Sequence, residues 1–188
     1  MELTRDRILQ QVAEIMGSAE PIELTVAEAA TRARVSVRTA YRYFPTRDAL
    51  IDAFNGWIMQ RFGSHKFPTT LEALPGYLAE LFRAFDVNEQ LIRASRRSEP
   101  GAEVRNRRKA SQVRAITQAV RTALPDLDDH AVRKFGSTLH LFGADAWIHM
   151  HDNWDLTTDE SIEAMQWALE ALITKLRKEA THGKKPKR

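Results

Sequence analysis

Apolar residues recur along this chain at intervals of three and four positions, which is the spacing of one face of an α-helix. The pattern is clearest near the two ends, at Ile8, Val12 and Ile15 and again at Leu169, Ile173 and Leu176. No stretch keeps the strict alternation of apolar and polar residues that a half-buried strand requires. The sequence therefore predicts an all-α fold.

Residues that cap helices divide this pattern into elements. A first helix is predicted from Thr4 to Gly17. Short helices are expected over 25–33, opened by a capping box of Thr25 and Glu28, and over 36–43, opened by Ser36. Thr46 is expected to cap a longer helix that reaches Gly63. Further helices are predicted over 69–85, 87–94, 104–124, 128–150 and 157–176, and Pro75 either kinks the first of these or delays its start.

A joint between two domains is predicted at Gly63–Pro68, where Gly, Ser and Pro cluster and the charge pattern changes. The chain of 188 residues is long enough for two small domains. We therefore expect an N-terminal head over residues 1–63, a C-terminal helical domain over 64–183 and a basic tail over 184–188.

The amino-acid composition excludes several classes of protein. The chain is 43% apolar and 28% charged, as in ordinary globular proteins. It contains no Cys, which excludes a disulfide framework, a thiolate metal site and a Cys nucleophile. The first residues lack the apolar core of a secretory signal, and no run of about 18 uncharged apolar residues occurs. We therefore expect a cytoplasmic protein with no membrane partner.

The formal net charge of +3 is small, but its distribution is uneven. Residues 31–50 hold five basic residues against one acid, and residues 93–114 hold eight basic residues against two acids. The first stretch includes a helix rich in Ser, Thr, Arg and Tyr, whose side chains hydrogen-bond phosphates and base edges. The second stretch and the tail are more typical of solvated faces, and a contact of Arg93–Arg114 with DNA stays open.

Two short helices joined by a tight turn outline a helix-turn-helix at about residues 25–44. Residues 25–30 (TVAEAA) and 35–50 (VSVRTAYRYFPTRDAL) resemble the TetR family of bacterial transcriptional regulators. Arg7, Ile8 and Leu9 are also similar to the first helix of that family. Arg34 departs from the pattern because the family usually has Gly there, and a left-handed turn strains Arg by about 1 kcal/mol.

The resemblance implies a regulator of transcription, most often a repressor, that binds double-stranded DNA at a palindromic operator as a homodimer. Implied contacts to the DNA backbone are Thr25, Tyr41, Tyr43 and Arg47, and implied contacts to bases are Ser36, Val37, Arg38, Thr39 and Arg42. Arg38 is the leading candidate, since a bidentate Arg–guanine pair is worth about 1–3 kcal/mol. Alternatively, Ser36 serves only as a cap, Tyr43 as core and Arg42 as a solvated charge.

The resemblance also implies that a small-molecule effector binds the second domain and that the last two helices form the dimer. The expected pocket residues lie on facing sides of the middle helices: Phe82, Phe85, Leu91, Val113, Ile116, Phe135, Leu139, His140 and Phe142. The expected dimer contacts are Trp147, Met165, Leu169, Leu172 and Ile173. An anionic effector is favoured if the pocket contains Arg93, Arg97 or His140, and an apolar or cationic one if these residues face solvent.

No metal site or cofactor is predicted. His149 and His151 are two positions apart, so a helix directs them to different sides. No catalytic motif occurs, and the best pair for an enzyme is His140 with Asp145 on poorly aligned faces. Two alternatives to a DNA-binding regulator stay open: a helical ligand-binding or scaffold protein that has lost DNA binding, and a small helical enzyme.

Overall fold

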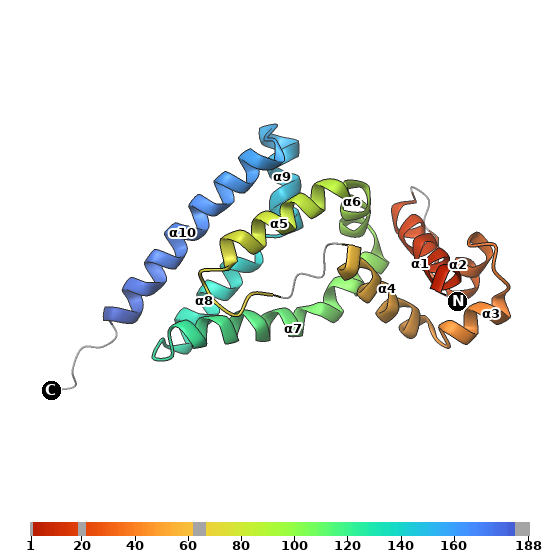
Figure 1. The fold of residues 1–188 in the computed structure, drawn as a ribbon, viewed down its shortest axis with the longest axis horizontal. Helices are drawn as coiled ribbons and strands as arrows, with labels where there is room; N and C mark the ends of the chain where they lie inside the picture. The colour runs from red at the N-terminus through yellow and green to blue at the C-terminus, as the bar shows by residue number, and fades with distance from the viewer. Residues whose placement is uncertain (1, 19–21, 62–66, 183–188) are drawn as a thin grey trace. The chain divides into compact units, whose positions relative to one another are not determined.

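The computed structural model describes residues 2–18, 22–61 and 67–182, and this part of the chain forms ten helices and no strand (Figure 1). The prediction of an all-α fold is confirmed. The predicted joint at 63–68 falls partly outside the described residues, and the predicted basic tail at 184–188 falls entirely outside them.

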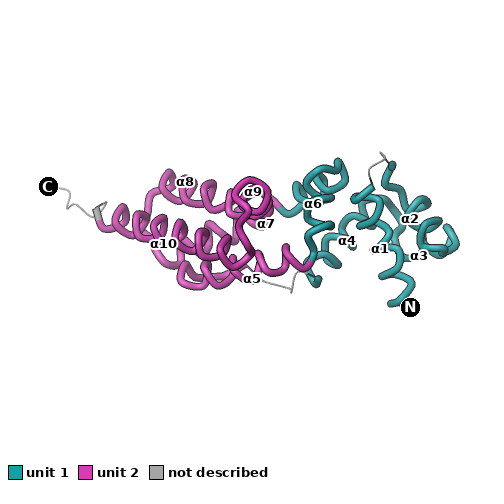
Figure 2. The backbone as a smooth tube through the Cα atoms, turned by 90° about the horizontal axis from the view of Figure 1, so that it is seen from above, with its two compact units in different colours: residues 1–64, 88–108 teal, residues 65–87, 109–188 magenta. Residues whose placement is uncertain are grey.

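The helices form two compact units, residues 1–64 with 88–108 and residues 65–87 with 109–188 (Figure 2). The sequence pattern predicted a simpler division into residues 1–63 and 64–183. The difference is the segment 88–108, which belongs to the first unit. Ile92 and Val104 of this segment are buried there, and Asn55 donates a hydrogen bond to the Val104 carbonyl at 3.4 Å. A short amphipathic segment has one apolar side, and its spacing alone does not say which neighbour covers it.

The first unit contains α1 (Glu2–Gly17), α2 (Val26–Arg32), α3 (Val37–Tyr43), α4 (Arg47–Arg61), α6 (Glu89–Arg97) and the beginning of α7 (Glu99–Ala123). α1 contacts α2, α3, α4 and α6, so it is the central helix of this unit. Its buried side presents Ile8, Leu9 and Val12 to the core. Phe44 and Phe54 complete the same core, which fixes the position of α3.

The second unit contains α5 (Leu74–Val87), the remainder of α7, α8 (Asp129–His140), α9 (Ala144–Trp154) and α10 (Thr158–His182). α10 packs along α5 and also contacts α8 and α9 (Figure 1). Trp147 of α9 is completely buried and meets Phe85 of α5 edge-on, with ring centroids 6.1 Å apart. Met165 and Leu169 of α10 are buried in this core as well.

Several helix boundaries differ from the predictions. The helix predicted over 128–150 is two helices, because Gly143 is extended and opens α9. α7 begins at Glu99 rather than at 104, and α5 begins at Leu74 rather than at 69. Each of these two helices has a proline in its first turn, where no intrahelical hydrogen bond is lost. Glu72, which precedes α5, forms an ion pair with Arg177. α1 begins at Glu2 rather than at Thr4.

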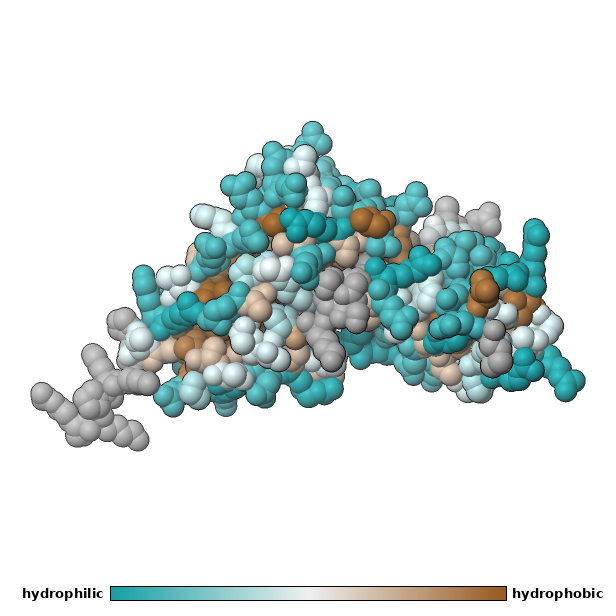
Figure 3. Space-filling view, viewed as in Figure 1, coloured by the Kyte–Doolittle hydropathy of each residue, from teal (hydrophilic) through white to brown (hydrophobic). Residues whose placement is uncertain are grey.

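The face of the molecule in Figure 3 is largely hydrophilic, with separate hydrophobic patches. Within the described residues, no helix combines the length and the apolar character needed to cross a membrane. The large apolar side chains that remain most exposed are Leu3, Val37, Tyr41, Val87, Val113, Leu141, Trp154 and Trp167.

Candidate nucleic-acid interface

Thr25 is the N-cap of α2, as predicted. Its backbone is extended, and its Oγ1 accepts a hydrogen bond from the Glu28 N–H at 3.0 Å. The second half of the predicted capping box is wrong, because the Glu28 carboxylate accepts from Arg32 Nε at 2.6 Å instead. The Thr25 hydroxyl can still donate its own proton while it accepts from Glu28, which is what a contact to a phosphate oxygen requires.

The turn between α2 and α3 has a left-handed residue, the geometry for which the resemblance implied strain at Arg34. Arg34 has a φ of 53° and is exposed. Just before it, the Ala33 carbonyl accepts a hydrogen bond from Arg7 of α1. The turn is therefore tied to the central helix of the first unit, although its most strained residue is not a glycine.

Ser36 caps α3. The Ser36 Oγ accepts from the Thr39 N–H at 3.1 Å and lies 2.7 Å from the Thr39 Oγ1. Ala40 and Phe44 are buried beneath the helix, whereas Val37 and Tyr41 are 41% and 47% exposed. Arg38 and Arg42 are exposed too. Positions 37, 38, 41 and 42 lie on one side of a helix, so α3 presents two arginines, a tyrosine and a valine together.

Tyr43 and Arg42 lie close to each other at the end of α3. The Arg42 guanidinium carbon is 5.9 Å from the centre of the Tyr43 ring, within the range of a cation–π interaction. The Tyr43 ring is half-buried and tilted against Phe44, with centroids 6.2 Å apart. Tyr43 therefore contributes to packing and also keeps part of its surface at the face that carries Arg42.

Arg47 begins α4 and lies beside the start of α2. Its Nε donates to the Leu24 carbonyl at 2.9 Å, and its Nη1 donates to the Glu103 Oε2 at 2.8 Å. Leu24 immediately precedes Thr25, so the two implied backbone contacts Thr25 and Arg47 are neighbours in space. The sequence pattern showed no sign of the acidic partner, which comes from α7.

Several arginines of the second basic stretch, residues 93–114, pair with groups of the first unit. Arg93 pairs with Glu89 at 2.7 Å, and Arg105 donates to the Ser95 carbonyl. Arg107 pairs with Asp48 at 2.6 Å and with Asp52 at 2.8 Å, both on α4. The concentration of positive charge at 93–109 is therefore balanced in part by acids that the fold brings to it.

The predicted pocket residues are distributed over both compact units and differ in burial. Phe82, Phe85, Ile116, Phe135 and Leu139 are buried in the second unit as core. Leu91 lies on α6, in the first unit. Val113 is 51% exposed, His140 is exposed and Phe142 is half-buried. The break before α9 changes which sides of the helices over 128–150 face inward. The expected pocket stays a prediction.

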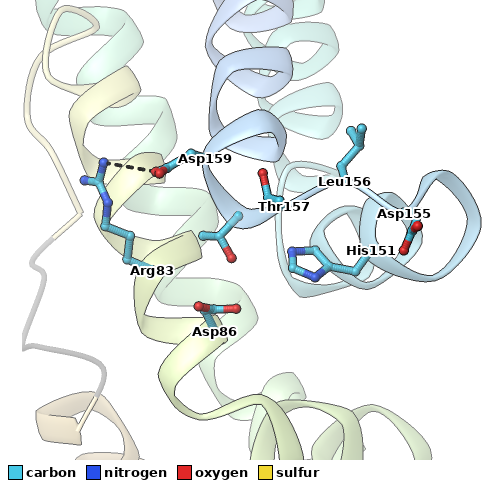
Figure 4. Close-up of a pocket in the computed structure, with 8 residues that line it drawn as sticks. Arg83, Asp86, His151, Asp155, Leu156, Thr157 and Asp159 are labelled. Carbon is cyan, nitrogen blue, oxygen red and sulfur yellow. Dashed lines mark ion pairs between the residues drawn. The ribbon is translucent and has the colours of Figure 1, made fainter.

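An open hollow of about 510 Å³ lies beside the start of α10 (Figure 4). Arg83 and Asp86 of α5, His151 of α9 and residues 155–159 line it. Arg83 Nη2 is 3.8 Å from Asp159 Oδ1, and the His151 ring lies against Trp147 with centroids 4.5 Å apart. His151 Nε2 is buried and has no hydrogen-bond partner in the described part of the chain. The sequence signal for this hollow was the short connection 155–157 between two helices, followed by polar residues in the first turn of α10.

The predicted dimer contacts lie mostly inside the chain itself. Trp147, Met165, Leu169 and Ile173 are between 0% and 7% exposed, and only Leu172 is partly exposed. These four side chains are buried within the chain itself. The reason is that the apolar stripe of α10 packs on α5. The expectation that they form a dimer interface stays a prediction. The apolar surface left on the last helices is Trp154 and Trp167, 69% and 75% exposed.

The histidines singled out in the sequence take separate places. His149 is exposed and lies 2.7 Å from Asn153, whereas His151 stacks on Trp147. His140 ends α8 and Asp145 lies in the first turn of α9. Across the described ranges, no three His, Asp or Glu side chains are grouped as ligands of one metal ion.

Comparison with known proteins bears on the fold. No protein-family model matches the sequence, and no curated protein matches it at a significant level. Among solved structures, the chain is similar to a TetR-family transcriptional regulator from Streptomyces coelicolor, with a TM-score of 0.56, 17% identity and coverage of 94% of this chain and 82% of that one. It is also similar to a TetR transcriptional regulator from Rhodococcus sp. RHA1, with a TM-score of 0.50, 21% identity and coverage of 93% and 98%. The chain therefore has the fold of TetR-type regulators.

Proposed function

We propose that this protein is a sequence-specific DNA-binding regulator of transcription and a member of the TetR family. The observation that carries the proposal is the construction of α3. Ser36 caps this helix, and Ala40 and Phe44 are buried beneath it. The opposite side bears exposed Arg38 and Tyr41. A helix of this kind fits the major groove, where donors and methyl-sized groups discriminate the base pairs.

Roles within this surface follow from side-chain chemistry. Arg38 is exposed and carries the fork of donors that matches guanine O6 and N7. Val37 offers an apolar contact to a thymine methyl group. Thr25, Tyr41 and Arg47 supply hydroxyl and guanidinium donors to phosphates, which fix the register on DNA without reading its sequence. Ser36 and Thr39 already bond each other at 2.7 Å, so their first role is to cap the helix.

We further propose that two copies associate and bind a palindromic operator. Trp167 on α10 is 75% exposed, and Trp154 at the end of α9 is 69% exposed. Burial of a large aromatic side chain is worth roughly 1.5–3 kcal/mol, and tryptophan is enriched at the centres of interfaces. A two-fold axis relates two identical α3 helices, which explains a preference for two inverted half-sites.

We propose that the protein acts as a repressor that a small molecule releases from DNA. The hollow beside α10 is lined by Arg83, by the carboxylates of Asp86, Asp155 and Asp159 and by His151, which suits a polar effector. Such an effector must bind one arrangement of the protein better than another. A coupling free energy of about 1–3 kcal/mol changes operator affinity roughly 5- to 150-fold.

Selection of fragments from sheared DNA of the source genome tests this proposal. Wild-type protein at physiological salt is expected to recover one palindromic sequence, and Arg38→Ala is expected to lose it. Arg61→Ala is the matched control, because Arg61 stacks on Trp57 at the other end of α4. Recovery of the same sequence by all three proteins, or of none by the wild type, contradicts the proposal.

A further inference from the structure

Arg107 of α7 holds α4 through a cluster of carboxylates in the first unit. Its Nη2 and Nη1 donate to Asp48 at 2.6 Å and to Asp52 at 2.8 Å. On its own helix, Nη2 also donates to the Glu103 Oε1 at 3.1 Å. Hydrogen bonds that Arg107 donates to Asp52 first, and then to Glu103 and Asp48, raise the pKa of Arg107 above its ordinary value. This guanidinium therefore already donates to three carboxylates of the first unit.

The second carboxylate oxygen of Glu103 accepts a hydrogen bond from a different arginine. The Glu103 Oε2 accepts from Arg47 Nη1 at 2.8 Å, while its Oε1 faces Arg107. One carboxylate therefore bridges a structural arginine and the arginine at the start of α4. Arg47 also donates from Nε to the Leu24 carbonyl, next to Thr25.

This arrangement places a negative charge where the proposed function needs a phosphate. Thr25 and Arg47 are the groups proposed to hold the DNA backbone, and Glu103 already occupies one Nη of Arg47. The side chains of Arg47 and Glu103 are 41% and 32% exposed, so both are accessible to an approaching phosphate. Carboxylate and phosphate repel each other, and they compete for the same guanidinium donors.

We propose that Glu103 competes with a DNA phosphate for Arg47 and thereby lowers the affinity of the head for DNA. This inference rests on the proposed function. Glu103 is a positioning residue that acts through Arg47 and does not itself bind DNA. α7 continues from the first unit into the second as one helix, Glu99–Ala123.

Glu103→Gln removes the competing charge and keeps most of the side chain. We expect it to tighten binding to duplex DNA about two- to fivefold, the range of an exposed ion pair. We also expect the slope of log affinity against log salt to become steeper by up to about 0.9, because Arg47 then neutralises a phosphate fully. Fluorescence anisotropy of a labelled duplex over a range of salt measures both quantities. Glu99→Gln, an equal change of charge on the exposed start of α7, is the control and is expected to change neither.

The double variant Arg47→Ala with Glu103→Gln separates competition from a general effect of charge. The gain from Glu103→Gln is expected to vanish in the Arg47→Ala background, since the two residues form one interaction. A gain that persists without Arg47, or weaker binding by a folded Glu103→Gln, overturns the inference. If Glu103→Gln does not fold, Glu103→Asp withdraws the carboxylate by one methylene and is expected to show a smaller gain of the same sign, and no gain overturns the inference.

Phosphate contacts do not read sequence, so the effect is expected on a selected operator and on a random duplex alike. This separates the inference from the proposed function. If the wild type prefers no sequence but Glu103→Gln still tightens random-duplex binding, the proposed function fails and the competition stands. If the wild type selects an operator and Glu103→Gln changes nothing, the competition alone fails. Absence of binding to any duplex contradicts both.

Discussion

The Val35 N–H donates to the Ala30 carbonyl at 2.9 Å and closes the turn between α2 and α3. The Arg34 N–H donates to the Thr31 carbonyl at 3.0 Å within the same turn. These two bonds define a Schellman motif, whose left-handed position usually carries glycine. Arg34 occupies that position with a φ of 53°. The head therefore keeps the standard turn at the cost of backbone strain in one residue.

Replacement of Arg34 by glycine is expected to stabilise the protein by about 1 kcal/mol, because glycine adopts a left-handed backbone without steric cost. Arg34→Ala is the matched control, since it removes the charged side chain but keeps the Cβ that causes the strain. Urea unfolding of both variants measures the effect. Equal stability of the glycine and alanine variants contradicts this explanation of the turn.

Gly101 allows α6 and α7 to approach each other closely. A Cβ at this position collides with the backbone of Ser95, whereas a Cβ at Gly56 in α4 meets no atom within 4 Å. Gly101→Ala is expected to destabilise the protein by about 1–3 kcal/mol. Gly56→Ala is expected to stabilise it by roughly 0.5–1 kcal/mol, because alanine is the better helix former. Thermal unfolding compares them, and a shift of the same sign in both argues against close packing at Gly101.

Glu160 makes the start of α10 sensitive to acid. Hydrogen bonds from the Thr157 backbone N–H first, and then from its hydroxyl, lower the pKa of the Glu160 carboxyl below its ordinary value of 4.5. A lowered folded-state pKa means that the stabilisation is complete above the ordinary value and is lost as pH falls through the lower one.

Glu160→Gln is therefore expected to be less stable than the wild type near neutral pH, and the difference is expected to shrink below about pH 5. Urea midpoints across this pH range measure the difference. Glu170→Gln, an exposed change on the same helix, is the control. A difference between Glu160→Gln and the wild type that does not vary with pH contradicts the role of the carboxylate in this cap.

Trp167 is expected to hold two copies of the chain together. Trp167→Ala is expected to weaken self-association roughly tenfold to a hundredfold, the effect of truncating an aromatic residue at the centre of an interface. Val87→Ala is the control, because Val87 is 84% exposed on a different helix of the same unit. Analytical ultracentrifugation measures both dissociation constants. Unchanged association of Trp167→Ala places the interface elsewhere.

Local features of the fold could be predicted from sequence because they depend on neighbouring residues. Thr46 caps α4 by accepting from the Ala49 N–H at 3.1 Å, and Asp128 caps α8 by accepting from Ala131 at 2.8 Å. The break between α8 and α9 was missed, since apolar spacing continues in phase through Leu139 and Phe142 although the backbone does not.

Features that depend on distant residues could not be predicted. Arg47 and Glu103 are 56 positions apart, and nothing in their neighbours indicates that they meet. The helix α10 has an apolar stripe and an exposed tryptophan on different sides, and spacing does not reveal which side meets α5. The candidate DNA-binding surface could be predicted from the sequence because it lies within one short helix and the residues beside it.

The most direct test of the account is the ratio of dissociation constants for a selected operator and for a random duplex of equal length, measured at one physiological salt concentration. The wild type is expected to prefer the operator by roughly a thousandfold or more. Arg38→Ala is expected to lose about tenfold to a hundredfold of this preference while its affinity for the random duplex changes little. A wild-type ratio near one, or a ratio that Arg38→Ala leaves unchanged, contradicts the claim that α3 reads DNA sequence.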